Sequence, residues 1–336
     1  TDGAMNKILS RIGLHIKTEA NYLFFRRYRY WRVAFRHLSR YYTPDAAPSV
    51  TKERMIVFMA DGRYLHGGFA DRLRSILTNY RYCRDHGIRF AINFTFPFPL
   101  ENYLESAAYD WRLKPGELTF NSREAMPVFT DTAPYETVRE MTFRRNTAYR
   151  AFAHDKRQIH LYGALYWDDS DFATLFRQLF RPVPHLQAEI DRHIHAIGGK
   201  YVSVSTRFME LLGDFTEPKP GTVLSPEHRQ SLIDRCISQL ESIHGRHPEA
   251  ARILVTSDSS GFLEHCSALP YVYVIPGAIA HSDTASATDH TKTFVDFMMI
   301  SHASKAYQLI GGGMYGGNFS LRASQIAGVP YERITF

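Results

Sequence analysis

The fold of this chain is indicated first by the segment Met55-Ile56-Val57-Phe58-Met59 and by the segment that follows it, Gly67-Gly68-Phe69-Ala70-Asp71-Arg72. The first run is continuously apolar, which is typical of a buried parallel strand. The two glycines allow positive φ and close backbone approach, and the helix expected after them offers free N–H groups to an anionic ligand. This order predicts an α/β fold that opens with a nucleotide-binding turn, although two glycines also occur in tight turns that bind nothing.

The rest of the first half continues the alternation of strands and helices. After a short linker at 44–49, the apolar pattern predicts strands at 55–59, 88–94 and 159–162 and helices at 71–85, 134–149 and 172–180. In chain order, the strand at 55–59, the helix at 71–85 and the strand at 88–94 form a right-handed βαβ unit by default. The aromatic stretch 97–132 is assigned neither an element nor any chemistry.

The second half alternates more regularly. The chain is broken by Arg181-Pro182-Val183-Pro184, and a helix then ends at Gly198-Gly199. Beyond that point we expect strands at 201–205, 253–256, 271–275 and 307–310, separated by helices at 226–244, 261–268, 293–303 and 320–327. Strands separated by helices make a parallel sheet.

These patterns predict three parts. Residues 1–49 form a basic amphipathic arm with its linker, residues 50–195 a first Rossmann-like domain, and residues 196–336 a second one. Two such sheets facing each other place their strand ends, where ligands bind, across one crevice.

Composition limits the class of protein. A chain of 336 residues, 44% hydrophobic and 22% charged, folds as a globular protein and is long enough for two domains. Its 3 cysteines are far apart and match no metal spacing, which favours a reducing, cytoplasmic compartment. No apolar run approaches the ~20 residues that a membrane span needs, and no signal peptide is recognised.

The net charge of +6 favours anionic partners, and the arm carries most of it. From Lys7 to Arg40 there are nine Lys or Arg and a single acid, Glu19. Residues 6–42 either pack as a helix on their own domain or bind an anionic membrane surface, which would make the protein peripheral at the inner face. Nucleic acid is not expected, because no binding module accompanies the charge.

Three strand ends in the second half carry polar chemistry. Arg207 follows the strand at 201–205, where its guanidinium suits a diphosphate, unless it pairs on the surface with Glu210 or Asp214. Ser257 and Asp258 follow the next strand and can bind a ribose or base, or merely cap the helix after them. The last strand runs into 311–320, with five glycines between 311 and 317, a loop whose amides can bind phosphate.

The order of these segments resembles the GDP-fucose-dependent fucosyltransferases of the two-domain GT-B type. The turn at 67–72 is similar to the family's opening Gly-rich turn, and Phe180-Arg181-Pro182 to its bridge between domains. The segment 202–208 resembles its His-x-Arg-Arg strand, 255–258 its Thr-Asp-Asp segment, and 318–323 its closing Ser-x-Phe-Ser-x-x-Ala helix. The chain departs from these motifs at three positions, Ser205, Phe208 and Ser259, which stand where the relatives carry side chains that help to read guanosine.

The resemblance implies an inverting, metal-independent transfer of fucose from GDP-fucose to a glycan, with Arg207 on the donor's β-phosphate. The expected donor-binding residues are Gly67, Gly68, Arg72, Arg207, Ser257, Asp258, Gly316, Gly317, Asn318, Phe319 and Ser320. The candidates for catalysis are Arg207, His66, Asp61 and Glu210. No divalent metal is expected, since Asp169-Ser170-Asp171 precedes a helix and reads as an N-cap.

Two alternatives stay open. The three departures allow a transferase of the same architecture that uses another nucleotide sugar. A protein of another class would bind glycans or nucleotides at a membrane without catalysis, with the basic arm as its active feature.

Overall fold

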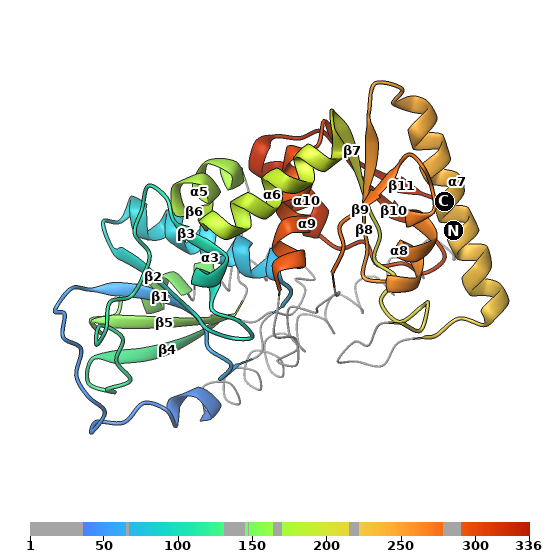
Figure 1. Ribbon diagram of the computed structural model, residues 1–336. Coiled ribbons are helices and arrows are strands. Elements are labelled where there is room, and N and C mark those ends of the chain that lie inside the picture. Colours follow the sequence, from blue (N-terminus) through green and yellow to red (C-terminus); the bar gives the residue numbers. More distant parts are fainter. Residues whose placement is uncertain are drawn as a thin grey trace, which may run out of the picture. The chain divides into compact units, whose positions relative to one another are not determined.

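A computed structural model describes residues 36–64, 67–130, 145–146, 148–163, 170–214, 222–277 and 290–336. The chain forms two compact units (Figure 1). Unit 1 takes the described residues within 1–66, 78–93 and 112–167, and unit 2 those within 67–77, 94–111 and 168–336. The division into two domains between residues 195 and 196 stays a prediction.

Unit 1 is built on a four-stranded sheet in the order β2-β1-β5-β4. Both β1 and β4 run parallel to β5. The strands are β1 (Met55–Ala60), β2 (Arg89–Phe94), β4 (Ala125–Thr130) and β5 (Gln158–Gly163). Every residue of β1 is buried, as its apolar sequence predicts. Strand β4 lies in the stretch to which no element was assigned.

The helix predicted after the glycine turn is α3 (Phe69–Asp85), and it begins two residues earlier than expected. The helix expected over 134–149 falls largely outside the described residues, which are helical at 145–146 and 148–152. Most of the predicted basic arm also lies outside them. Residues 36–39 are helical, and Leu38 is buried in a cluster with Met55 and Val57, so this end of the arm belongs to the core of unit 1.

Unit 2 is built on a five-stranded sheet in the order β11-β10-β7-β8-β9, in which every neighbouring pair is parallel. Its strands are β7 (Tyr201–Ser205), β8 (Arg252–Thr256), β9 (Val272–Val274), β10 (Lys305–Ile310) and β11 (Tyr331–Thr335). The chain starts at β7, proceeds through β8 and β9, and returns to the other side of β7 for β10 and β11. Ligands of open α/β sheets bind where the strand order reverses in this way, so the carboxyl ends of β7 and β10 are the place to look.

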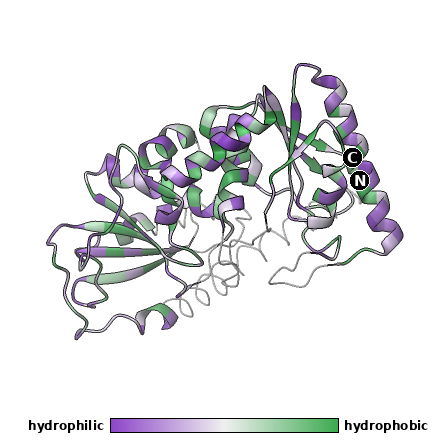
Figure 2. Cartoon of the chain, viewed as in Figure 1, coloured by the Kyte–Doolittle hydropathy of each residue, from purple (hydrophilic) through white to green (hydrophobic). Residues whose placement is uncertain are grey.

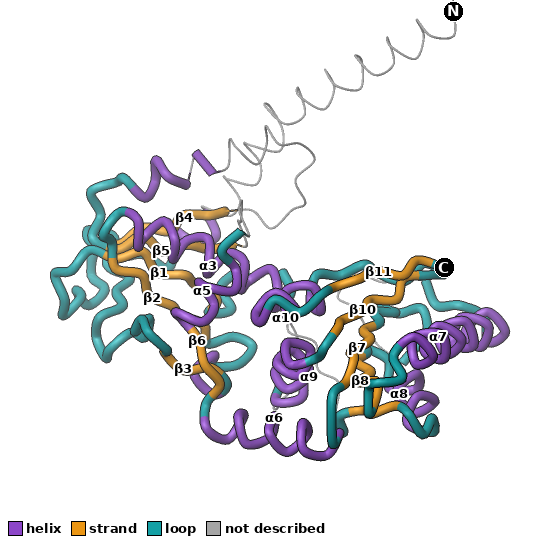
Figure 3. The backbone as a smooth tube through the Cα atoms, turned by 90° about the horizontal axis from the view of Figure 1, so that it is seen from above, coloured by secondary structure: helices purple, strands orange, loops and turns teal. Residues whose placement is uncertain are grey.

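Helices cover both faces of this sheet (Figure 3). On one face lie α7 (Pro226–Arg246) and α8 (Ser260–Ser267). The opposite face carries α6 (Pro184–Ile197), α9 (Thr291–His302) and α10 (Phe319–Ala327). The predicted α/β class with parallel sheets is confirmed, and the elements predicted for the second half are present within about two residues of their expected ends.

The remaining elements of unit 2 come from two separate parts of the chain. They are the 3-10 turn η2 (Leu100–Asn102), β3 (Leu104–Ser106), α5 (Phe172–Leu179) and β6 (Phe180–Pro182). Strands β3 and β6 pair antiparallel. Asp171 occupies the N-cap position of α5, as predicted, although its side chain makes no capping hydrogen bond there.

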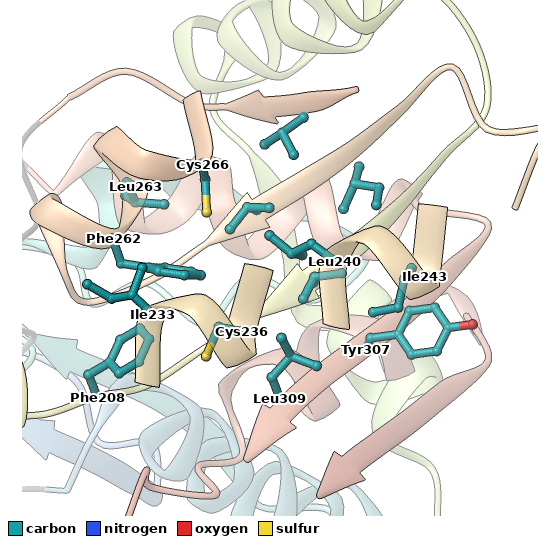
Figure 4. Close-up of a cluster of buried hydrophobic side chains, with 14 of the residues drawn as sticks. Phe208, Ile233, Cys236, Leu240, Ile243, Phe262, Leu263, Cys266, Tyr307 and Leu309 are labelled. Carbon is teal, nitrogen blue, oxygen red and sulfur yellow. The ribbon is translucent and has the colours of Figure 1, made fainter. Parts of the chain in front are cut away.

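Alternation of side chains along the strands creates the core (Figure 4). Val202 and Val204 of β7 point into a cluster with Tyr307 and Leu309 of β10. Helix α7 closes this cluster with side chains at three- and four-residue spacing, which are Leu232, Ile233, Cys236, Leu240 and Ile243. In Figure 2 much of the α7 ribbon has the colour of hydrophilic residues.

A glycine after β10 allows close contact with the last residue of the sequence. A Cβ atom on Gly311 would lie 2.7 Å from the backbone oxygen of Phe336 and 2.7 Å from its ring. The Phe336 N–H donates to the Ile310 carbonyl at 3.1 Å, which holds that backbone in place. Only glycine therefore fits at position 311 without displacing the sheet edge.

Replacing this glycine tests the contact. We expect Gly311→Ala to lower the free energy of unfolding by about 1–3 kcal/mol, because an added methyl group overpacks a rigid site. The control is Gly245→Ala on α7, where a Cβ atom meets nothing within 4 Å and should stabilise the helix by a few tenths of a kcal/mol up to about 1. Urea unfolding measures both, and equal stability of the two variants would contradict the packing described here.

Candidate functional site

The carboxyl ends of β7 and β8 are joined by buried hydroxyl groups. Ser205 and Thr256 share a hydrogen bond of 2.8 Å between their hydroxyl oxygens. One residue later, the Thr206 hydroxyl donates to Ser257 Oγ at 2.8 Å. Ser257, predicted to bind donor, therefore also braces the loop that carries Arg207.

Asp258 fixes the backbone immediately after Arg207. Its two carboxylate oxygens accept the N–H groups of Phe208 and Met209, each at 2.8 Å. Met209 has φ of 56°, the left-handed region that a side chain other than glycine rarely adopts. Burial raises the pKa of Asp258, while the two N–H groups and the nearby Arg207 oppose that rise. The alternative interpretation of Asp258 as the cap of α8 is wrong, since Ser259 occupies the N-cap and accepts the Phe262 N–H at 3.1 Å.

A second carboxylate fills the amino end of α8. One Asp214 oxygen accepts from the Ser259 hydroxyl at 2.7 Å and from the Gly261 N–H at 2.8 Å. A carboxylate at a helix N-terminus satisfies free N–H groups and interacts well with the helix dipole. With Asp214 and Asp258 both present, the end of β8 repels a further anion and is unsuited to phosphate.

The end of β10 has the opposite character. The loop after it takes positive φ at Gly312 (56°) and Gly313 (91°) and then leads into α10. The structure gives no hydrogen bond from the backbone N–H groups of Gly316, Gly317 and Asn318 to any residue that it describes. Asn318 is the N-cap of α10 and makes no side-chain capping bond. Consecutive open N–H groups at a helix N-terminus are an anion-binding arrangement.

Arg207 lies beside this loop. Its backbone carbonyl accepts the Tyr315 N–H at 2.9 Å, and its guanidinium lies over the Tyr315 ring at 5.6 Å. Its Cδ atom lies 3.7 Å from where a Cβ on Gly317 would be. The Tyr315 side chain remains 53% exposed, so an aromatic surface borders the guanidinium and the open N–H groups.

Two further residues of the predicted donor set are largely internal. Phe319 packs its ring edge-on against Phe297 of α9, with centroids 5.0 Å apart. Ser320 is 1% exposed, and its hydroxyl lies 3.4 Å from that of Tyr331. In this arrangement both residues anchor α10; before them, Gly316 is exposed and Gly317 and Asn318 are half-buried.

The turn at Gly67 and Gly68 differs from the predicted one. Neither Gly67 nor Gly68 has a positive φ, so the turn does not use the conformational freedom of glycine. Arg72 is 2% exposed, and it donates from Nε to the Gly67 carbonyl at 2.9 Å and from Nη1 to the Phe96 carbonyl at 3.1 Å. Through these two hydrogen bonds, Arg72 holds the backbone of the turn in place.

The candidate base Asp61 is internal to unit 1. Its carboxylate is 4% exposed, forms an ion pair with Arg63, and accepts the Tyr162 hydroxyl at 3.2 Å. His66, the other candidate from this turn, lies outside the described residues. Glu210 lies three residues after Arg207 and is half-buried, with its carbonyl accepting the Gly213 N–H at 3.0 Å.

Unit 1 also contains a buried polar chain that begins at Tyr42. The Tyr42 hydroxyl and His160 Nδ1 share a hydrogen bond of 2.8 Å, and His160 Nε2 lies 3.0 Å from Gln158 Oε1. Burial lowers the pKa of His160 to about 3, so the ring is neutral at physiological pH. The arrangement of these groups explains their burial, because each polar atom finds a partner.

No group of three or more His, Cys, Asp or Glu residues within the described ranges is placed to hold a metal ion. Likewise, no helix in the described part of the chain is long and apolar enough to cross a membrane.

Comparison with solved structures identifies the fold. NodZ alpha-1,6-fucosyltransferase soaked with GDP-fucose aligns over 82% of this chain and 93% of its own, with 14% identity and a TM-score of 0.52. The same enzyme co-crystallised with GDP gives the same values. Fucosyltransferase NodZ from Bradyrhizobium aligns over 81% of this chain and 92% of its own, with 14% identity and a TM-score of 0.51. No protein-family model and no curated protein matches the sequence.

The chain therefore has the fold of the NodZ fucosyltransferase. The resemblance found in the sequence motifs is confirmed at the level of the fold, across most of both chains.

Two residues beside the glycine loop, Gln308 of β10 and Arg333 of β11, are not predicted by any sequence motif. Gln308 donates from Nε2 to the Gly317 carbonyl at 3.0 Å, and Arg333 donates to the same oxygen at 3.2 Å. A signal existed in Tyr331-Glu332-Arg333-Ile334-Thr335, which is rich in β-branched and aromatic residues and follows a helix. It is short and lies at the end of the sequence, and no motif includes it.

The role of Asp258 can be tested through its two acceptor oxygens. An amide in its place keeps one acceptor and brings a donor toward the second N–H, so Asp258→Asn should lower the free energy of unfolding by about 1–3 kcal/mol. Ser260→Ala on α8 serves as the control, since its hydroxyl lies 3.3 Å from Asp214 and is exposed. Urea unfolding compares the two, and an unaffected Asp258→Asn variant would show that the carboxylate does not hold the loop.

Proposed function

We propose that this protein is an inverting, metal-independent glycosyltransferase that transfers fucose from GDP-fucose to a glycan. The observation that carries the proposal is the pairing of Arg207 with the open N–H groups of Gly316, Gly317 and Asn318, at the point where the strand order of the sheet reverses. The likeness to a fucosyltransferase structure soaked with GDP-fucose supports the choice of donor.

The chemistry follows from charge. When the bond between the sugar and the diphosphate breaks, the departing GDP gains negative charge on its β-phosphate. A guanidinium and backbone N–H groups at that position would stabilise the developing negative charge. These groups do the work that a divalent cation does in other transferases, so the reaction needs no metal.

Inversion requires a base that removes the proton of the acceptor hydroxyl as that oxygen attacks the sugar carbon from the face opposite the diphosphate. Asp61, His66 and Glu210 remain the candidates. Glu210 shares the loop of Arg207, whereas Asp61 would first have to leave Tyr162 and Arg63. In this proposal the chain is of GT-B type, with the donor on the C-terminal domain and the acceptor on the N-terminal one.

The identity of the donor is the open part of the proposal. The Ser205 hydroxyl is hydrogen-bonded to that of Thr256, Phe208 is fully buried, and Ser259 caps α8. The side chains at the three departures from the family motifs therefore all have contacts within the protein. A transferase that uses another nucleotide sugar keeps the same phosphate site.

Donor binding separates these alternatives. We expect GDP and GDP-fucose to raise the melting temperature, because a ligand that binds only the folded state stabilises it, and UDP-sugars to have little effect. Chelation of divalent metals should leave both binding and transfer unchanged. Stabilisation by UDP-sugars alone would reject GDP-fucose as the donor.

Removal of the guanidinium tests the site itself. Arg207→Ala should weaken GDP binding by about 10- to 100-fold, since a hydrogen bond to a charged group contributes about 1.5–3 kcal/mol. Arg252→Ala is the matched control. Arg252 is the first residue of β8, at the amino ends of the strands and so away from the proposed site, and it donates to the Pro270 carbonyl. Calorimetric titration with GDP gives both values, and equal affinity in the two variants would refute the placement of the diphosphate.

We further propose that residues 6–42 bring the enzyme to the cytoplasmic face of an anionic membrane, on the basis of their charge. The full chain should sediment with vesicles containing an anionic lipid and release at high salt, as screening predicts. A chain with the cations at 7–32 replaced by Gln should stay in the supernatant; sedimentation equal to that of the unaltered chain would disprove the attachment.

A further inference from the structure

A buried amide side chain is directed at the glycine loop from the middle of the sheet. Gln308 of β10 is 3% exposed, and its Nε2 donates to the Gly317 carbonyl at 3.0 Å. The same carbonyl accepts from Arg333 Nη2 at 3.2 Å. Two donors from two neighbouring strands therefore converge on one backbone oxygen.

These bonds also fix an N–H group. The Gly317 carbonyl and the Asn318 N–H belong to one peptide plane, and in a trans peptide they point in opposite directions. Because the carbonyl is directed toward Gln308 and Arg333, the Asn318 N–H must be directed away from them. This N–H is one of the open groups next to Arg207, so the sheet determines where it points.

The side chain of Gln308 is itself held in one orientation. Its Oε1 accepts the Tyr331 hydroxyl at 2.9 Å and Arg333 Nε at 2.9 Å. Arg333 Nε carries an N–H that can only donate, so it must face the amide oxygen; the amide therefore cannot flip, and Nε2 faces Gly317. Gln308 and Arg333 lie opposite each other in the pairing of β10 with β11, which brings the two side chains together.

We propose that Gln308, held in one orientation by Arg333, is a positioning residue for the diphosphate of the donor. It holds the peptide between Gly317 and Asn318 in the one orientation that presents the N–H to an anion. The guanidinium of Arg333 donates to Gln308 and to the Gly317 carbonyl, whereas the guanidinium of Arg207 is the positive charge that this proposal assigns to the ligand. This inference rests on the proposed function, since it assigns the diphosphate to the same loop.

The cluster offers matched variants. Gln308→Met keeps the size of the side chain and removes the donor to Gly317. Gln308→Glu keeps an acceptor for Tyr331 and Arg333 but turns an oxygen toward the carbonyl. Tyr331→Phe removes a hydrogen bond from the same cluster without touching the Gly317 carbonyl, and serves as the control.

Three probes separate positioning from general structure. GDP and inorganic pyrophosphate contain the diphosphate, and guanosine does not. We expect both Gln308 variants to bind GDP and pyrophosphate about tenfold more weakly than the unaltered protein and guanosine with unchanged affinity, because only the preorganisation of the phosphate site is lost. Tyr331→Phe should lose less than threefold for each probe, with a melting temperature matching that of Gln308→Met.

Contrary results are equally clear. Unchanged pyrophosphate affinity in both Gln308 variants, or a parallel loss of pyrophosphate and guanosine, would overturn the positioning role. If the unaltered protein binds pyrophosphate but neither GDP nor guanosine, the proposed function fails while the pyrophosphate titrations still decide the inference. If it binds none of the three, both are overturned.

Discussion

The rest of the site depends on two hydrogen bonds, in which the N–H groups of Phe208 and Met209 donate to the Asp258 carboxylate. It ties the end of β8 to the first residues after β7 and stabilises Met209 in a left-handed conformation that costs of order 1–3 kcal/mol in itself. The carbonyl of Arg207, placed by this loop, receives the Tyr315 N–H and so sets the start of the glycine loop. Arg207 and the open N–H groups therefore share one support.

The same edge of the sheet is divided by charge. At β8 and α8 the protein supplies its own anions, Asp258 and Asp214, which satisfy the local N–H groups. At β10 and α10 the N–H groups of Gly316, Gly317 and Asn318 make no hydrogen bond to a described residue, and the Arg207 side chain lies beside them. In the proposed function, a diphosphate at the carboxyl ends of these strands would meet repulsion from Asp214 and Asp258 on one side and hydrogen-bond donors on the other.

The regular alternation of the second half made its sheet and most of its helices predictable, because apolar runs of strand length separated by helical patterns allow few other folds. The polar groups were found at the right strand ends, but their roles depended on distances that a sequence does not carry. The sequence predicts that Asp258 binds the donor, and its two contacts of 2.8 Å show that it also holds a loop. Gln308 was missed because a single glutamine inside an apolar strand has no motif, and its partner Arg333 lies 25 residues farther along the sequence.

A structure of the protein with GDP bound is the most direct measurement of the central claim. The account predicts β-phosphate oxygens within hydrogen-bonding distance of the Arg207 guanidinium and of the N–H groups of Gly317 and Asn318, with the Gly317 carbonyl still bound to Gln308. A diphosphate found instead against α8, in place of the Asp214 carboxylate, or one that leaves Arg207 and the glycine loop untouched, would contradict it.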